Sequence, residues 1–300
     1  MRKALFLYHA LSAVFLAFLI SGSGILKSLA QENNTEYTEL ASRSFARIPS
    51  HQLLVNARLV NHGDIIESGM IWRIFSDIID KNGRNPLIAT SKGGSAILKL
   101  VPGDYLVHAS FGRAGITQRV KIYNEDVELN VVLQAGGLLL NADSGGEKIS
   151  PRYLTFSIYE NEKDETGERQ LIACNVTPNK VIPLNEGTYH VISQYGKINA
   201  ITHADLEVEA GSTTHAMLHH NAAPVRMKLI SKSGGYPVAN TSWSVFNSKG
   251  KKIFSSQHVS PFFILEKGKY EAYAGNGQRR FKTTFQVIPG LTHEIEIIIK

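Results

Sequence analysis

The chain has 300 residues, of which 43% are hydrophobic and 19% are charged, a composition typical of an ordered globular protein. Its single cysteine excludes both an internal disulfide framework and a zinc site built from several thiolates. The formal net charge of +6 is too small for this length to indicate a nucleic-acid-binding protein unless the basic residues are clustered.

The first 30 residues have the composition of an export signal. Arg2 and Lys3 precede a largely apolar run over residues 4–20, and Ser28-Leu29-Ala30 places small residues at the two positions that a signal peptidase reads. We predict a signal peptide over residues 1–30 that is cleaved after Ala30. The alternative is an uncleaved anchor, because the stretch from Ile20 to Ala30 is long for a cleavage region and contains Lys27, although the apolar run is at the short limit for a membrane span. Both interpretations place the rest of the chain outside the cytoplasm, either in the periplasm or secreted.

A flexible linker is predicted next, because residues 31–49 are polar and rich in Glu, Thr and Ser. Beyond it, the pattern Leu-x-x-Gly-x-Tyr occurs three times, and each tyrosine is followed seven residues later by a glycine. Each copy also has an aromatic-x-β-branched-aromatic segment upstream of its tyrosine. Such registration indicates a domain that is present three times. The tyrosines of the three copies are Tyr105, Tyr189 and Tyr270, and the copies are predicted at residues 50–134, 135–221 and 222–300.

Within each copy, apolar and polar residues alternate with a period of two, and turn residues recur about every eight to twelve positions. This pattern predicts short antiparallel strands and no amphipathic helix. So many strands in a domain of this size bury their apolar faces best as two sheets packed face to face. The predicted fold class is therefore all-β, with three tandem seven-stranded Greek-key β-sandwich domains in an elongated array. In the first copy the strands are expected near 52–60, 69–76, 86–90, 94–101, 104–110, 117–122 and 126–133.

The Leu-x-x-Gly-x-Tyr spacing resembles the tyrosine corner of Greek-key sandwiches, in which the phenol hydroxyl reaches back to an upstream backbone group. In the third copy, Gly235-Tyr-Pro237-Val238 resembles the opening of carboxypeptidase-regulatory-like and other transthyretin-like or collagen-adhesin B-type repeats. The resemblance implies tandem transthyretin-like or immunoglobulin-like sandwiches in an exported bacterial-type protein, with structural roles for the three tyrosines. It implies no particular activity, because such sandwiches have many functions.

Most of the individual residues that could carry chemistry have a simpler structural interpretation. Trp72, Phe156 and Trp243 could stack on sugars, but each lies two residues before a β-branched residue on the same strand face, which favours a core position. His215 and His219 are four residues apart on a predicted strand and therefore roughly 13 Å apart, too far to bind one metal ion together. We expect His215, His219 and His220 to be solvated histidines on the face of a strand.

Catalysis is also disfavoured by the sequence. Cys174 aligns with Thr90 of the first copy and is predicted to be an ordinary strand position. Motifs for a nucleophilic serine, a zinc protease or a phosphate-binding loop are absent from the sequence. We predict no catalytic residues, no metal and no cofactor, although a triad assembled across loops is an alternative that spacing does not exclude.

Charge differs sharply between the three copies. Residues 50–134 have 9 basic and 8 acidic side chains, residues 135–221 have 6 and 11, and residues 222–300 have 12 and 4. A basic third copy would attract an anionic polymer of the envelope or of the extracellular space. Two alternatives stay open: these charges keep the surface soluble, or they pair with the acidic second copy of a neighbouring molecule. The residues predicted to bind the partner are Lys249, Lys251, Lys252, Arg279, Arg280 and Lys282.

These features together predict a noncatalytic exported protein of binding or adhesion type. Its expected partner is an anionic envelope or extracellular polymer, or another protein, with nucleic acid disfavoured by the modest total charge. The first alternative is a periplasmic structural or assembly protein that binds another protein. The second is a carbohydrate-active enzyme or its accessory module, which would require carboxylates or aromatic residues clustered in one groove, and a deep polar cleft is the feature that would distinguish it.

Overall fold

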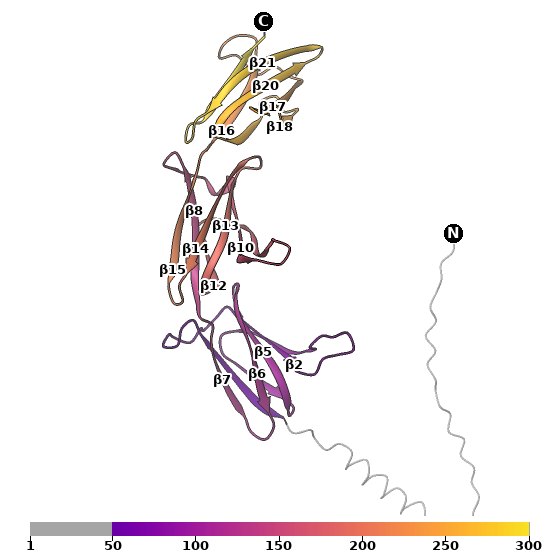
Figure 1. The fold of residues 1–300 in the computed structure, drawn as a ribbon, viewed down its shortest axis with the longest axis vertical. Helices are drawn as coiled ribbons and strands as arrows, with labels where there is room; N and C mark the ends of the chain where they lie inside the picture. Colours follow the sequence, from indigo (N-terminus) through magenta and orange to yellow (C-terminus); the bar gives the residue numbers. More distant parts are fainter. Residues whose placement is uncertain (1–49, 300) are drawn as a thin grey trace, which may run out of the picture. The chain divides into compact units, whose positions relative to one another are not determined.

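β-Strands build almost all of the regular structure of the computed structural model, which describes residues 50–299 (Figure 1). The helical structure in this range is one 3₁₀ turn at Pro151–Tyr153. The predicted all-β class with tandem β-sandwiches is confirmed. The predicted signal peptide and linker lie outside the described residues, and the repeat boundaries and elongated array stay predictions.

The first sandwich contains a three-stranded sheet of order β4-β1-β7 and a four-stranded sheet of order β3-β2-β5-β6. Alternate residues of both sheets point inward and form one apolar core that includes Leu53, Trp72 and Ile122. The strands are β1 (His51–Arg58), β2 (Met70–Ser76), β3 (Leu87–Gly93), β4 (Ala96–Leu100), β5 (Gly103–Phe111), β6 (Ala114–Ile122) and β7 (Val127–Val132).

The second sandwich repeats this plan with sheets of order β12-β8-β15 and β11-β10-β13-β14. A two-residue strand, β9, pairs with β8 and is additional to the seven strands predicted for each copy. Its core is centred on Phe156, Ile158 and Leu140. The strands are β8 (Ala135–Ser144), β9 (Glu147–Lys148), β10 (Leu154–Lys163), β11 (Arg169–Val176), β12 (Val181–Asn185), β13 (Gly187–Tyr195), β14 (Ala200–Val208) and β15 (Thr213–His220).

The third sandwich has sheets of order β19-β16-β22 and β18-β17-β20-β21. Trp243, Val245 and Leu229 lie in its core. The strands are β16 (Ala222–Ile230), β17 (Thr241–Asn247), β18 (Lys252–Ser256), β19 (Phe262–Glu266), β20 (Gly268–Asn276), β21 (Arg279–Val287) and β22 (His293–Ile298).

One feature of the sheets differs from the prediction of antiparallel strands. In each sandwich the first and last strands pair in parallel, as in the register that joins Leu53 to Val127. Side-chain alternation determines which face of a strand is buried but carries no information about the direction of its neighbour. The prediction was therefore wrong for this one pair in every copy.

The three tyrosines of the repeated motif have the same geometry. The hydroxyl of each donates a hydrogen bond to the carbonyl oxygen four residues earlier, at 2.7 Å for Tyr105 and 2.8 Å for Tyr189 and Tyr270. Burial raises the pKa of each phenol, so the hydroxyls stay protonated donors. Each bond ties the start of a central strand to the strand that precedes it.

Consecutive sandwiches contact each other through a glycine-containing turn. The Arg113 amide, in the turn between β5 and β6, donates to the Pro183 carbonyl on β12 at 2.9 Å. In the next pair, the Asn199 side chain donates to the Tyr270 hydroxyl at 3.1 Å and accepts from the Glu266 amide at 3.2 Å. Ile264 on β19 also packs into the core of the second sandwich.

Candidate functional site

The candidate site lies on the outer face of the sheet β18-β17-β20-β21 in the third sandwich (Figure 1). On β17 the inward side chains of Trp243 and Val245 are fully buried, so the residues between and after them point outward. On β20 the same alternation buries Ala272 and Ala274. The outward-facing positions of the two central strands are Ser242, Ser244, Phe246, Glu271, Tyr273 and Gly275, of which Gly275 has no side chain.

The strand register brings these outward residues together with three cations from the flanking strands. Tyr273 pairs with Ser244 on one side and with Lys282 on the other. In the next row on one side, Gly275 pairs with Ser242 and with Arg280. In the next row on the other side, Phe246 pairs with Lys252 and with Glu271. The result is a shallow groove of about 440 Å³. It is lined by Ser242, Ser244, Phe246, Lys252, Tyr273, Ala274, Gly275 and Arg280.

Two aromatic rings form the centre of this groove, and cations lie over both of them. The Phe246 and Tyr273 ring centroids are 5.5 Å apart at an interplanar angle of 82°, an edge-to-face arrangement. Lys252 Nζ lies 6.0 Å from the Phe246 centroid and Lys282 Nζ lies 5.5 Å from the Tyr273 centroid. Cation–π contacts of this kind hold both ammonium groups beside the ring pair.

One carboxylate modifies the charge of the groove. Glu271 accepts an ion-paired hydrogen bond from Lys282 Nζ at 3.0 Å and a hydrogen bond from the Tyr273 hydroxyl at 3.1 Å. The Lys282 bond, followed by the Tyr273 bond, holds the pKa of Glu271 below its ordinary value, and the same carboxylate raises the pKa of Lys282. Both side chains are therefore charged near neutral pH and neutralise one another, while Lys252 and Arg280 contribute positive charge on opposite edge strands.

Two of the six predicted partner-binding residues, Lys252 and Arg280, line this groove, and a third, Lys282, lies beside it over the Tyr273 ring. Lys249 and Lys251 lie on the β17–β18 turn, where their backbone amides donate to the Asn247 side chain, and they do not line the groove. Arg279 places its guanidinium 5.0 Å from the Phe281 ring centroid, away from the groove lining.

Sequence reasoning did not assign Phe246 or Tyr273 to the site. The signal that identifies them is parity: each lies an odd number of residues from a core aromatic on the same strand, Trp243 or Tyr270, and so faces the other way. Of the aromatic residues singled out as structural, Trp72, Phe156 and Trp243 are at most 2% exposed, so sugar stacking on these three is excluded.

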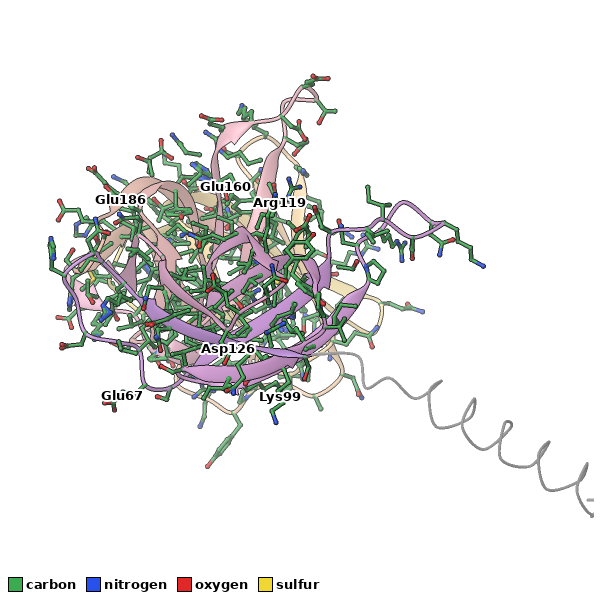
Figure 2. All side chains as sticks on the ribbon, turned by 90° about the horizontal axis from the view of Figure 1, so that it is seen from below. Glu67, Lys99, Arg119, Asp126, Glu160 and Glu186 are labelled. Atoms are coloured by element: carbon green, nitrogen blue, oxygen red, sulfur yellow. The ribbon has the colours of Figure 1, made fainter. Side chains whose placement is uncertain are left out.

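The corresponding faces of the other two sandwiches have different chemistry. In the first, the hollow is lined by residues that include Phe75 and His108 at the positions of Phe246 and Tyr273. Side chains of both signs are distributed over this sandwich, as Figure 2 shows for Glu67, Lys99, Arg119 and Asp126. The corresponding hollow of the second sandwich is lined by Tyr159 with Lys163 and Arg169, so an aromatic ring with nearby cations occurs there too, whereas the edge-to-face ring pair of Phe246 and Tyr273 lies in the third sandwich.

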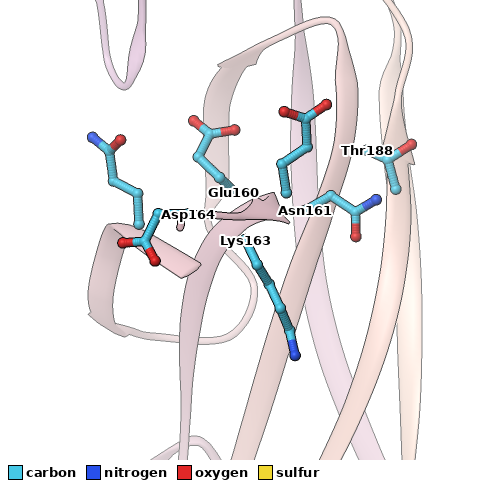
Figure 3. A pocket seen from close by; sticks show the side chains of 7 residues that line it. Glu160, Asn161, Lys163, Asp164 and Thr188 are labelled. Atoms are coloured by element: carbon cyan, nitrogen blue, oxygen red, sulfur yellow. The ribbon is translucent and has the colours of Figure 1, made fainter. Parts of the chain in front are cut away.

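One hollow of the second sandwich is acidic, with Glu160, Glu162 and Asp164 in its lining. It has a volume of about 570 Å³ and lies beside the β10–β11 hairpin. Figure 3 shows Glu160, Asn161, Lys163, Asp164 and Thr188 around it, with the Lys163 side chain extending away from the Glu160 carboxylate. In the described part of the chain, no group of three or more His, Cys, Asp or Glu residues is arranged to hold a metal ion.

The three histidines near the end of β15 do not share one environment. His219 is exposed and its Nδ1 lies 2.8 Å from an Asp143 oxygen, and His215 is exposed. His220 is buried, so its predicted solvation was wrong: its Nε2 lies 2.8 Å from the Ser193 hydroxyl, and both residues are closed off from solvent. Because a substrate cannot reach it, this Ser–His pair has no access for nucleophilic catalysis. Cys174 is an exposed free thiol on β11.

Comparison with known proteins associates part of the chain with a described repeat. Residues 224–299 match the model of a family described as the Rhizobiales growth-associated tandem repeat domain. A search of curated proteins finds no match to the sequence.

Several solved structures are similar to the chain. The TIE protein of Bacillus anthracis is 18% identical with a TM-score of 0.24, over 84% of this chain and 51% of that chain, so the chain spans about half its length. The minor pilin of Streptococcus agalactiae is 15% identical with a TM-score of 0.32, over 57% and 95%. The major pilin subunit of Bacillus cereus is 10% identical with a TM-score of 0.23, over 83% and 99%. Within residues 50–299, none of the helical structure is long and apolar enough to span a membrane.

Proposed function

We propose that this chain is an exported, noncatalytic binding protein of the cell envelope, in the periplasm or secreted, whose third repeat recognises an anionic polymer. The observation that carries the proposal is the position of Lys252, Arg280 and Lys282 around one aromatic groove of the third sandwich. Clustered cations raise the local concentration of a polyanion and supply charge-assisted hydrogen bonds to its carboxylate or phosphate groups.

Charge distribution supports assigning this role to the third repeat. Residues 222–300 have 12 basic and 4 acidic side chains, whereas residues 135–221 have 6 and 11. The interaction energy of a polyanion with the two repeats is thus of opposite sign, and salt would weaken its attraction to the third.

The test is a charge reversal in the groove. Lys252→Glu and Arg280→Glu together are expected to lower the affinity for hyaluronate and for polyphosphate at least tenfold, measured by calorimetry or interferometry on the protein as its host makes it. Both side chains are exposed, so the fold and the circular dichroism spectrum should not change.

A matched control changes the same number of charges on the same sandwich. Lys232 and Lys267 are exposed and do not line the groove, and their replacement by Glu should change the affinity less than threefold. Equal losses in the two double variants would show that only the net charge matters. Unchanged binding in the groove variant would reject the site.

A second candidate is a structural or assembly role in which the repeats bind another protein. The opposite net charges of residues 135–221 and 222–300 favour this alternative, because the second repeat of one molecule would attract the third repeat of another. Light scattering at two salt concentrations separates it from the first proposal, since pairing of acidic second repeats with basic third repeats would produce association without an added polymer.

A further inference from the structure

The floor of the groove at its centre is aromatic and hydroxylated, and the charges beside it, Lys282 and Glu271, pair with each other, which suggests what kind of anionic polymer the groove accepts. Between the strands that carry Lys252 and Arg280 lie Phe246, Tyr273 and the hydroxyls of Ser242 and Ser244. A site for a densely charged polymer needs cations throughout its length, whereas an aromatic and hydroxyl floor contributes little to binding a bare chain of phosphates.

The floor is also kept open by a glycine. A Cβ atom at Gly275 would lie 2.7 Å from the Ser242 hydroxyl oxygen, so a side chain at this position would displace Ser242 and fill the hollow. Gly275 does not have a positive φ, so the turn geometry does not account for it. What the glycine provides is space beside the Tyr273 ring on a flat face of the sheet.

An aromatic edge-to-face pair with adjacent hydroxyls matches the chemistry of a sugar ring. The C–H face of a pyranose is apolar and packs on an aromatic ring, while its hydroxyls exchange hydrogen bonds with serine side chains. A neutral sugar packed on the aromatic rings would gain no charge-assisted hydrogen bond from Lys252 or Arg280. The presence of these two cations therefore indicates that the same polymer also carries acidic groups.

The spacing of the charges indicates that the acidic groups are separated by uncharged sugar. Lys252 lies on edge strand β18 and Arg280 on edge strand β21, so their strands are about 14 Å apart. The two residues are also offset by four positions along the sheet, because Lys252 lies in the row of Glu271 and Arg280 in the row of Gly275. Glu271 lies on β20 between these edges and is ionised, and it would repel an anionic group placed at the centre of the groove.

We propose that the ligand of the third repeat is an acidic polysaccharide with carboxylates on spaced sugars, in which a sugar ring packs on Tyr273 and Phe246 and flanking carboxylates bind Arg280 and Lys252. This inference rests on the proposed function, because it names the polymer class for the same groove. A dense, sugar-free polyanion is bound less specifically by the cations alone.

The experiment compares two probes: hyaluronate, which has a carboxylate on alternate sugars, and polyphosphate, which has no sugar. Tyr273→Ala is expected to weaken hyaluronate binding about five- to tenfold by removing the ring contact, and to change polyphosphate binding less than twofold. Tyr273→Phe keeps the ring and should retain hyaluronate affinity within about threefold. Glu271→Gln should strengthen polyphosphate binding more than hyaluronate binding.

Tyr236 provides the matched control, since it is an aromatic side chain of the same sandwich that is 95% exposed and outside the groove. Tyr236→Ala should leave both affinities unchanged. If Tyr273→Ala weakens both probes equally, or neither, the polysaccharide assignment is overturned while the charge-reversal result for the proposed function still stands. If the Lys252→Glu and Arg280→Glu variant binds both probes normally, the proposed function itself fails.

Discussion

His220 is buried in the folded protein, although the sequence predicted a solvated histidine at this position. It is 3% exposed, its Nε2 lies 2.8 Å from the Ser193 hydroxyl, and the Tyr195 ring meets it edge-on at a centroid distance of 5.8 Å. Burial lowers the pKa of His220 to about 4, and the negative charge of Asp143 only partly opposes this effect. The imidazole is therefore neutral in the folded protein at neutral pH.

A pH-dependent loss of stability follows from this lowered pKa. The unfolded chain binds the His220 proton near pH 6.5 and the folded protein near pH 4, so the free energy of unfolding should fall as the pH drops from about 6.5 to about 4 and then level off. The loss is on the order of 3 kcal/mol. Urea unfolding at several pH values measures it.

The matched variant for this measurement is His220→Asn, which keeps a polar side chain without the titration. Carboxylates whose pKa is lowered in the folded protein, such as Glu271, also lose their contribution to stability as the pH falls. The quantity to compare is therefore the difference in unfolding free energy between the unmodified protein and the His220→Asn variant at each pH. An identical pH dependence in both would mean that His220 does not titrate in this range.

At the scale of strands, the sequence predicts most of the architecture but not all of the pairing. The strands of the first copy appear where the alternation of residues such as Leu53 and Val55 indicated, because burial of one face determines that period. The parallel pairing of β1 with β7 joins strands that are far apart in the chain. The local alternation of apolar and polar residues does not indicate which distant strand will be the neighbour.

The candidate site was predictable only in part for a related reason. Lys252, Arg280 and Lys282 were found because they belong to a cluster of basic residues in the sequence. Phe246 and Tyr273 lie on different strands, and only the register that aligns Ser244 with Tyr273 and Lys282 places them together. A cluster of charged residues can be identified from the sequence, whereas the residues that line a groove depend on which strands are neighbours in the sheet.

The glycines that follow β5, β13 and β20 occupy equivalent turns with positive φ, yet their surroundings differ. A Cβ at Gly112 would lie 2.7 Å from Pro183, and one at Gly196 would lie 2.8 Å from Ile264, each on the next sandwich. A Cβ at Gly277 meets no described atom within 4 Å. The first two glycines thus allow both a left-handed turn and a close approach.

Alanine at these three positions should separate the two effects. Gly277→Ala is expected to cost about 1 kcal/mol through backbone strain alone. Gly112→Ala and Gly196→Ala should cost about 2–3 kcal/mol, because the added methyl group also pushes against the neighbouring sandwich. Chemical denaturation measures all three. Equal losses would show that the contact with the next sandwich adds nothing.

At the scale of the whole molecule, the contacts between sandwiches determine whether the repeats unfold together. The second and third sandwiches share the bonds of Asn199 to Tyr270 and Glu266, and Ile264 packs into the core of the second. Tandem repeats are stabilised by their own cores and by the interfaces with their neighbours, so an interface bond couples the two unfolding equilibria.

Asn199→Ala should therefore change the shape of the unfolding transition and not only its midpoint. Loss of both bonds is expected to remove about 1–2 kcal/mol of coupling and to split the calorimetric transition of the second and third sandwiches.

Asn276 is the matched control, because its side chain donates to the Ala239 carbonyl at 2.7 Å within the third sandwich. Asn276→Ala should lower the stability of that sandwich without splitting the transition. If the two variants give the same calorimetric profile, the Asn199 bonds stabilise one sandwich locally and do not link neighbours, and the repeats would then unfold independently.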